Sequence, residues 1–272
     1  MTGFIGYQGS GRHFGQPPAA SQVRDARLLH IDRLVPGVFE AKHVLDVGCN
    51  AGAVDVQLAL EFQAASVTGV DIDQQLVRRA QSHLSFCWSR SKPGNTPEAD
   101  YFPASAILEL GHRPYPPVRP APSDNVHDRH SAAAAATPLS PFPHNVAFFC
   151  EDWALSASSS PSQGRYDVIL ALSVIKWIHL EHLDAGLRAL FRKFASALNG
   201  GGYLILELQP WSSYEKAIHP RKAPHFASSL RKLTIRPEDF DSLLGEEGLN
   251  HVVTSLELPR SICIYQKPAN VT

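Results

Sequence analysis

The sequence has no paired cysteines, no long apolar run and no excess of charge of either sign. The four cysteines are scattered, without a C-x-x-C pair, at Cys49, Cys87, Cys150 and Cys263. This argues against a zinc site or a disulfide framework and is typical of a reducing compartment. No apolar run approaches the roughly 20 residues that cross a bilayer, and the N-terminus shows no signal-peptide core. We therefore expect a soluble, intracellular protein without a metal.

The charge balance excludes a protein that binds polyanions over its whole surface. The 272 residues carry a formal net charge of −1, and 44% of them are apolar while 19% are charged. This is an ordinary globular balance with enough apolar material for a sizeable core. Any contact with nucleic acid must therefore come from a local patch.

Apolar runs alternate with stretches of helical periodicity along most of the chain. The predicted strands are residues 43–47, 66–70, 146–150, 166–172, 203–208, 252–256 and 262–266. The predicted helices are residues 21–33, 53–62, 74–88, 179–198 and 237–248, and the run Asn199-Gly200-Gly201-Gly202 is expected to end the fourth of them. Strand and helix in alternation predict one α/β domain over residues 1–272, with a doubly wound, seven-stranded, mostly parallel sheet.

Residues 89–144 break this pattern. The segment contains many prolines and an alanine run, and it has no sustained period. Such a composition cannot bury enough surface to offset the chain entropy. We interpret it as a low-complexity, mostly disordered insertion within the domain, with residues 102–105 as an ordered island.

The loop after the first predicted strand carries Asp46, Gly48, Asn50 and Gly52. Glycine allows the backbone to turn sharply and a ligand to approach closely. Asp71 follows at the end of the next strand, where a carboxylate can accept ribose hydroxyls. The third glycine of a dinucleotide fingerprint is missing, so S-adenosylmethionine fits better than a pyrophosphate cofactor. A glycine turn in an unrelated α/β protein is the alternative.

A polar and aromatic cluster follows the apolar strand that ends at Glu207. It consists of Trp211, Ser212, Ser213 and Tyr214, and a basic segment without acidic residues comes next, with Lys216, Arg221, Lys222, Arg231, Lys232 and Arg236. Phosphate contacts from such a segment would dominate RNA affinity. A solvated charged loop is the alternative. The two aromatic rings either stack on nucleotides or pack the loop.

Four motifs resemble the methylphosphate capping enzymes, the bicoid-interacting type of RNA methyltransferases. They read Leu45-Asp46-Val47-Gly48-Cys49-Asn50, Gly69-Val70-Asp71-Ile72-Asp73, Leu172-Ser173-Val174-Ile175-Lys176-Trp177-Ile178-His179-Leu180 and Gln209-Pro210-Trp211-Ser212-Ser213-Tyr214. The resemblance runs from about residue 6 to 267 outside the insertion. It implies a Rossmann-like class I methyltransferase that transfers a methyl group from S-adenosylmethionine to the 5′-terminal γ-phosphate of a small non-coding RNA.

The resemblance also implies roles for single residues. Those expected to bind the cofactor are Phe14, Arg27, Asp46, Gly48, Cys49, Asn50, Gly52, Asp71, Ile72, Asp152, Trp153 and Leu172. Arg27 would pair with the cofactor carboxylate, a task that suits a guanidinium fork, and Leu172 would cover the adenine. A solvated helix arginine and an ordinary core leucine are the respective alternatives.

Three residues are candidates for the catalytic end of the site: His13, Lys176 and His179. A terminal phosphate oxygen is already anionic, so the reaction needs positioning rather than a strong base. A structural role at the start of a helix is the alternative for His179. The chain departs from the family pattern at two points, with His13 where a tyrosine is expected and Asp152-Trp153 where Asn-Tyr is expected.

Other functions stay open from the sequence: methylation of a 5′-monophosphate end, a small-molecule methyltransferase, or a non-catalytic RNA-binding subunit of a small ribonucleoprotein. The expected partners are the 5′ end of a small RNA and RNA-binding proteins of the same particle, with neither DNA nor membrane. The expected location is the nucleoplasm, and the cytoplasm is a second expected compartment.

Overall fold

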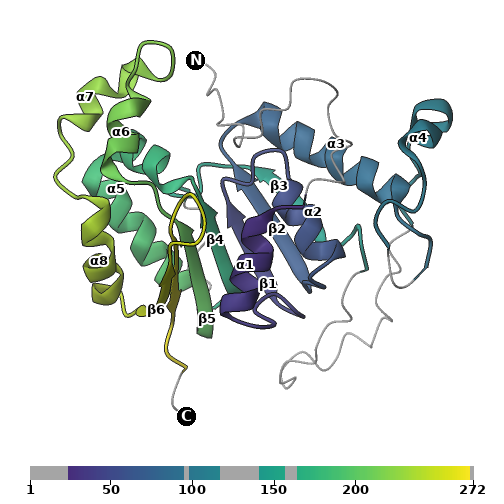
Figure 1. Cartoon of the computed structure of the whole chain (residues 1–272), viewed down its shortest axis with the longest axis horizontal. Helices are drawn as coiled ribbons and strands as arrows, with labels where there is room; N and C mark the ends of the chain where they lie inside the picture. Colours follow the sequence, from purple (N-terminus) through teal and green to yellow (C-terminus); the bar gives the residue numbers. More distant parts are fainter. Residues whose placement is uncertain (1–23, 95–97, 117–140, 157–163, 270–272) are drawn as a thin grey trace, which may run out of the picture.

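The computed structural model describes residues 24–94, 98–116, 141–156 and 164–269. They form a seven-stranded sheet with helices on both faces (Figure 1), and the strand order is β3-β2-β1-β4-β5-β7-β6. Strand β7 runs antiparallel to both of its neighbours, β5 and β6, and the other neighbouring pairs of this sheet are parallel. The bounds are β1 His43–Val47, β2 Ser66–Asp71, β3 Val146–Cys150, β4 Tyr166–Leu172, β5 Leu198–Glu207, β6 Asn250–Ser255 and β7 Ile262–Gln266. The predicted fold class is thus confirmed.

Alternating strand residues divide the core into two layers, because successive side chains point to opposite faces of a sheet. In β4, Val168 and Leu170 pack with helices α1 (Ala26–Leu34), α2 (Ala53–Leu60) and α3 (Gln74–Arg90). Ile169 and Ala171 pack with α5 (Ile175–Ala197) and α8 (Phe240–Glu246). A strand buried on both faces explains why this run of the sequence is almost continuously apolar.

Side-chain caps fix the starts of two helices. Asp25 accepts a hydrogen bond from the Arg27 backbone N–H at 2.9 Å, and Asp73 accepts one from Gln75 at 2.7 Å. Both aspartates satisfy a backbone donor that the first helical turn leaves unpaired. No helix within the described ranges has the length and apolar character needed to cross a membrane.

The predicted strands agree closely with the structure, whereas several helices differ. Helix α5 begins at Ile175, before the predicted start at residue 179, and the backbone bends at Leu183, which has φ +60°. Strand β5 begins at Leu198, so the run Asn199–Gly202, which was predicted to end the preceding helix, lies within the strand. Helix α6 (Trp211–Ala217), the 3₁₀ turn η2 (Pro224–Phe226) and α7 (Ala227–Leu230) were not predicted, and neither was the split of the last helix into η3 (Pro237–Asp239) and α8.

The insertion predicted over residues 89–144 begins too early, and its ordered part extends beyond the predicted island at residues 102–105. Helix α3 continues to Arg90, and a further helix, α4, spans Ala104–Leu110. Arg113 donates to the Ser89 side chain at 2.9 Å, and its guanidinium lies 3.7 Å over the Trp88 ring. Side-chain and aromatic contacts thus hold residues 112–116 against α3. Residues 117–140 lie outside the described ranges.

A third, smaller core lies beside the first half of α5. Leu180 of α5 packs there with Tyr214, Phe226 and Leu233, and α6 and α7 gather next to α5 at the upper left of Figure 1. Asp184 ties this region together, because it accepts bonds from the Thr234 backbone at 2.8 Å and the Thr234 hydroxyl at 2.5 Å. Burial raises the pKa of Asp184, but the bonds from Thr234 and His179 outweigh it and bring the pKa to about 2.

Two glycine substitutions test the packing between β3, α2 and α3. Gly52 has φ +74°, and a Cβ there would lie 2.7 Å from Phe148 and 2.8 Å from Ala80. Gly52→Ala should therefore lower the free energy of unfolding by about 2–4 kcal/mol through strain and overpacking. The control is Gly245→Ala in α8, where no atom lies within 4 Å of the added carbon. It should stabilise the protein by about 0.5–1 kcal/mol. Equal effects of the two variants in urea unfolding would contradict this packing.

A second test concerns Asp184. Its folded-state pKa lies below the unfolded value, so its stabilisation is present above about pH 4 and is lost as the pH falls toward 2. Asp184→Asn should lower the free energy of unfolding by about 2 kcal/mol at pH 7. The difference from wild type should shrink when urea unfolding is repeated between pH 5 and 3. A pH-independent difference would count against this role, and Glu246→Gln at an exposed ion pair should change stability by less than about 0.5 kcal/mol.

Candidate active site

The carboxyl ends of β1, β2, β4 and β5 meet at one edge of the sheet, because these four strands run parallel and are consecutive in the sheet. Open α/β folds bind ligands at this edge. Most of the residues singled out in the sequence come from the loops that leave these strands. His13 and Phe14 lie outside the described residues.

The glycine loop after β1 packs against the end of β4. Gly48 has φ +82°, and a Cβ there would lie 2.6 Å from Val174, so a larger residue would both strain the loop and push this segment away. Asn50 is also left-handed, with φ +52°, a conformation that asparagine tolerates better than most residues. The loop is thus held between the ends of β2 and β4.

Asp71 at the end of β2 holds the glycine loop from the other side. Its two oxygens accept the backbone N–H groups of Asn50 at 3.0 Å and Asp73 at 2.9 Å. Burial raises the pKa of Asp71, and these bonds oppose the shift. Each carboxylate oxygen keeps acceptor capacity for a second donor. The adjacent Ile72 leaves 48% of its surface exposed, which gives an apolar patch directly beside these acceptors.

Two predicted cofactor residues, one in β1 and one in the loop, are buried. Asp46 and Cys49 are almost fully buried, and burial raises the pKa of Asp46 to about 7 and that of the Cys49 thiol well above its ordinary value. Sequence reasoning missed their neighbour Asp55, a fully buried carboxyl on α2 whose pKa burial and the Asp46 charge raise. Three buried groups that ionise only with difficulty thus lie in and beside the loop.

Three further predicted cofactor residues, Asp152, Trp153 and Leu172, lie in different surroundings. Asp152 forms an ion-pair contact of 2.9 Å with His182, and Leu172 is buried at the end of β4. The Trp153 ring is buried and stacks on Phe194 of α5 with 5.4 Å between ring centroids. Trp153 therefore fills the core layer between the sheet and α5.

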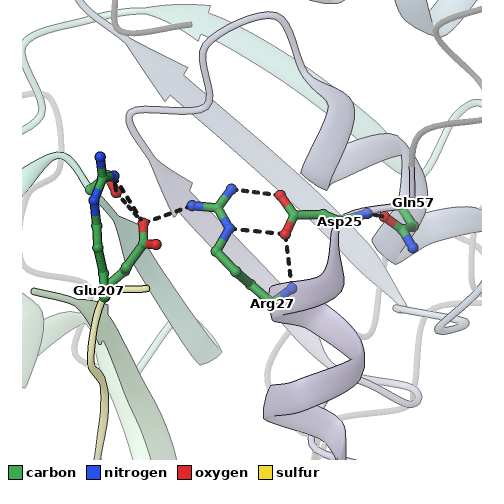
Figure 2. Close-up of polar contacts among 6 residues, drawn as sticks. Asp25, Arg27, Gln57 and Glu207 are labelled. Carbon is green, nitrogen blue, oxygen red and sulfur yellow. Dashed lines mark hydrogen bonds and ion pairs between the residues drawn. The ribbon is translucent and has the colours of Figure 1, made fainter. Parts of the chain in front are cut away.

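Arg27 lies between two carboxylates (Figure 2). Its Nε and Nη2 atoms donate to Asp25 at 2.9 and 2.6 Å, and Nη1 donates to Glu207 at 2.8 Å. Asp25 also accepts from the Arg27 backbone, and its own backbone N–H donates to Gln57 at 2.8 Å. The expected pairing with a cofactor carboxylate would add to these intramolecular partners. Glu207 lies far from Arg27 in the sequence, so sequence analysis did not identify it as a partner, whereas Asp25 is only two residues from Arg27.

Lys176 lies at the start of α5, two residues after Val174. Its Nζ donates to the Ser213 hydroxyl at 3.0 Å and lies 4.4 Å over the Trp177 ring. Burial, together with the positive charges of Arg260 and Lys222, lowers the pKa of Lys176 to about 8. Lys222 of the basic segment and Arg260 of the β6–β7 loop thus lie close enough to Lys176 to act on its charge, and sequence analysis did not identify Arg260.

His179 is fully buried between two partners. Its Nε2 lies 2.8 Å from Asp184, and its Nδ1 lies 3.4 Å from the Tyr214 hydroxyl. Burial lowers the pKa of His179, although Asp184 opposes the shift. These contacts give His179 a structural role inside α5 and not at the helix start where the alternative placed it, because α5 begins at Ile175. Its role in the reaction stays a prediction.

The aromatic pair after β5 also packs within the protein. The Trp211 ring stacks on Tyr214 with 4.9 Å between centroids, and the Arg236 guanidinium lies 3.7 Å over Trp211. Tyr214 is buried, which agrees with its packing alternative. The residues exposed around this pair include Ser212, Lys216, Arg221 and Lys222, and an open surface pocket is lined by Ser212, Glu215, Lys216, Ile218, His219 and Lys222.

Comparison with known proteins agrees with this architecture. Residues 166–267 match the family model described as bicoid-interacting protein 3 (Bin3). Among solved structures, the N-methyltransferase NodS from Bradyrhizobium japonicum WM9 in complex with S-adenosyl-L-homocysteine has a TM-score of 0.50 at 13% identity. The likeness covers 89% of this chain and 86% of that one, and it establishes the class I methyltransferase fold.

Three curated relatives carry the comparison further. The chain is 32% identical to the human 7SK snRNA methylphosphate capping enzyme over 78% of its own length and 31% of that protein. It therefore spans about a third of that relative. Identity to the mouse RNA 5′-monophosphate methyltransferase is 26%, over 75% of this chain and 55% of that protein. A probable RNA methyltransferase from Arabidopsis thaliana is 32% identical, and the match covers 84% of this chain and 71% of the plant protein. The chain therefore belongs to the Bin3 family of RNA methyltransferases.

Proposed function

We propose that this protein binds S-adenosylmethionine and methylates the 5′-terminal γ-phosphate of a small non-coding RNA. One observation carries the proposal. The glycine loop contacts Val174, two residues before Lys176, so a loop suited to an adenosine cofactor lies directly beside a buried cation. Such a neighbourhood suits a reaction between a cofactor and an anionic acceptor.

The residues at the sheet edge fit this cofactor. Asp71 offers acceptors for ribose hydroxyls beyond the two backbone bonds that it already receives. The exposed part of Ile72 offers apolar surface for an adenine ring, and burying such surface is favourable. When bound, S-adenosylmethionine would supply an electrophilic methyl group. With this cofactor and acceptor, the protein is an S-adenosylmethionine-dependent RNA 5′-phosphate methyltransferase.

In the proposed reaction, the residues of this chain hold the acceptor phosphate in place. A phosphate oxygen is already anionic near neutral pH, so a proton-abstracting residue is unnecessary. Lys176, with a pKa of about 8, is mostly protonated at neutral pH and can hold a phosphate by charge and hydrogen bonds. A neutral, buried His179 fits as support for the Lys176 region, through Tyr214 and α6.

Several exposed cations lie on and after α6, whose Ser213 holds Lys176, and they suit the rest of a polyphosphate and the first nucleotides. We assign Lys216, Arg221 and Lys222 to these contacts, together with Ser212 and Ser213 at the start of α6. Clustered cations favour a triphosphate over a monophosphate end, because each additional phosphate adds negative charge. Over about three quarters of this chain, the human relative named for 7SK snRNA capping is 32% identical and the mouse RNA 5′-monophosphate methyltransferase is 26% identical.

Two further proposals follow the relatives. The RNA partner is a small nuclear RNA, since the human relative is named for 7SK snRNA and a Drosophila melanogaster relative for U6 snRNA. The protein then works in the nucleoplasm, with RNA-binding proteins of the same particle as neighbours. Methylation of a monophosphate end and a non-catalytic RNA-binding role are the competing functions.

A methyl-transfer assay distinguishes these functions. The purified protein would be given labelled S-adenosylmethionine and one RNA sequence with a 5′-triphosphate, a 5′-monophosphate or a 5′-hydroxyl. We expect label on the triphosphate RNA, weaker label on the monophosphate RNA and none on the hydroxyl RNA. Asp71→Ala should weaken cofactor binding by about 1.5–3 kcal/mol, the scale of hydrogen bonds to a charged group, as measured by calorimetry. Cofactor binding without label on any RNA would favour the non-catalytic role, and preferential labelling of the monophosphate RNA would favour the competing substrate.

The basic segment gives a separate prediction for RNA affinity. Arg221→Ala combined with Lys222→Ala should weaken RNA binding for all sequences, and each lost phosphate contact should reduce the log–log salt slope by roughly one unit. Cofactor affinity should stay unchanged, because Asp71 and Ile72 lie on another loop. The matched control is Arg188→Ala with Arg192→Ala on the exposed side of α5. Wild-type RNA affinity and slope in the first double variant would leave Arg221 and Lys222 as solvated residues.

A further inference from the structure

We propose that Arg260, in the loop between β6 and β7, is a further phosphate-binding residue of this site; the inference rests on the proposed function. Arg260 comes from outside the basic segment and from the end of the chain. It nevertheless reaches the carboxyl ends of β4 and β5, where its Nη1 donates to the Ser173 hydroxyl and lies 3.8 Å from Glu207. The fold therefore brings a guanidinium to the place where the reaction would occur.

The surroundings of Arg260 differ from those of a surface arginine. Its side chain is 22% exposed, compared with 51% for Arg188 and 70% for Arg192 on α5. A partly buried guanidinium loses water and gains strength in its remaining interactions. The group is accessible enough to meet a ligand and shielded enough to bind it tightly.

Positive charge exceeds negative charge at this point. Glu207 is shared, because it binds Arg27 at 2.8 Å and lies 3.8 Å from Arg260. Within the described ranges, Lys176 pairs with no carboxylate and is held by Ser213 instead. Arg260 and Lys222 both lie near enough to Lys176 to disfavour its charge. Lys176 and Lys222 thus add positive charge beside Arg260, whose 3.8 Å contact with Glu207 is shared with Arg27, so an anion with several charges would stabilise this site.

Ser173 positions the arginine. Its backbone has φ +63°, a conformation that costs energy for a residue other than glycine and that persists where the surroundings impose it. In this conformation the hydroxyl donates to Glu207 and accepts from Arg260. Ser173 follows β4 directly and lies next to Val174, which contacts the glycine loop. Arg260 is thus fixed beside the cofactor loop, as a terminal phosphate group requires.

The test compares one RNA with a 5′-triphosphate and with a 5′-hydroxyl, bound in the presence of S-adenosyl-L-homocysteine. Wild type should prefer the triphosphate RNA. Arg260→Gln should weaken binding of the triphosphate RNA by about 10-fold or more, the equivalent of one lost charged hydrogen bond. The same variant should change binding of the hydroxyl RNA and of S-adenosyl-L-homocysteine by less than about twofold. Arg260→Lys keeps the charge but loses the planar fork, so it should lose at least about threefold of the preference. Arg188→Gln is the control and should match wild type.

The outcomes separate this inference from the function on which it rests. If wild type binds both RNAs equally, the proposed function fails and the role of Arg260 fails with it. If wild type prefers the triphosphate RNA and folded Arg260→Gln or Arg260→Lys keeps the full preference, only the role of Arg260 is overturned. Equal weakening of both RNAs in the glutamine variant would likewise overturn it and indicate a purely structural arginine.

Discussion

Glu207 joins parts of the chain that are far apart in sequence. Its carboxylate, buried at the end of β5, binds Arg27 of α1, accepts from Ser173 after β4 and lies 3.8 Å from Arg260 before β7. A buried carboxylate is costly unless cations and hydrogen bonds surround it, so these three groups and Glu207 require one another. The contacts fix the position of α1 against the sheet edge and hold the β6–β7 loop over it. The geometry of the proposed site depends on this arrangement.

The parts of the fold that depend on local pattern could be predicted from the sequence. Strands β1, β3, β4 and β7 have the predicted bounds, because buried strands are short apolar runs with polar flanks. Helices α4 and α6 were missed, since Ala104–Leu110 buries no residue and α6 follows a proline. The start of α5 was also misplaced, because Ile175 to Ile178 resemble a continuation of the apolar run.

The site could be predicted from the sequence only where its residues lie in one loop or at the ends of neighbouring strands. Asp71 and the glycine loop adjoin in structure as their spacing indicates, since β1 and β2 are neighbouring strands. Arg260, Glu207 and Arg27 come from three segments and meet through tertiary packing, which leaves no periodicity or motif in the sequence. For Trp211 and Tyr214, the sequence predicted a position beside the site but not the contacts of the rings. Only the structure shows that the two rings pack against each other and that Arg236 covers Trp211.

The same shared carboxylate connects the two halves of the proposed site. Arg27 was expected to meet the cofactor carboxylate, and Arg260 is proposed to meet the RNA phosphate, yet both now contact Glu207. An anion that draws one arginine away from Glu207 changes the charge that the other experiences, because Glu207 is a carboxylate that both contact. If both proposed roles hold, binding in one half should alter the affinity of the other, and the effect would be reciprocal. A methyltransferase that acts by positioning has a use for such a link, since the acceptor is best held when the methyl donor is in place.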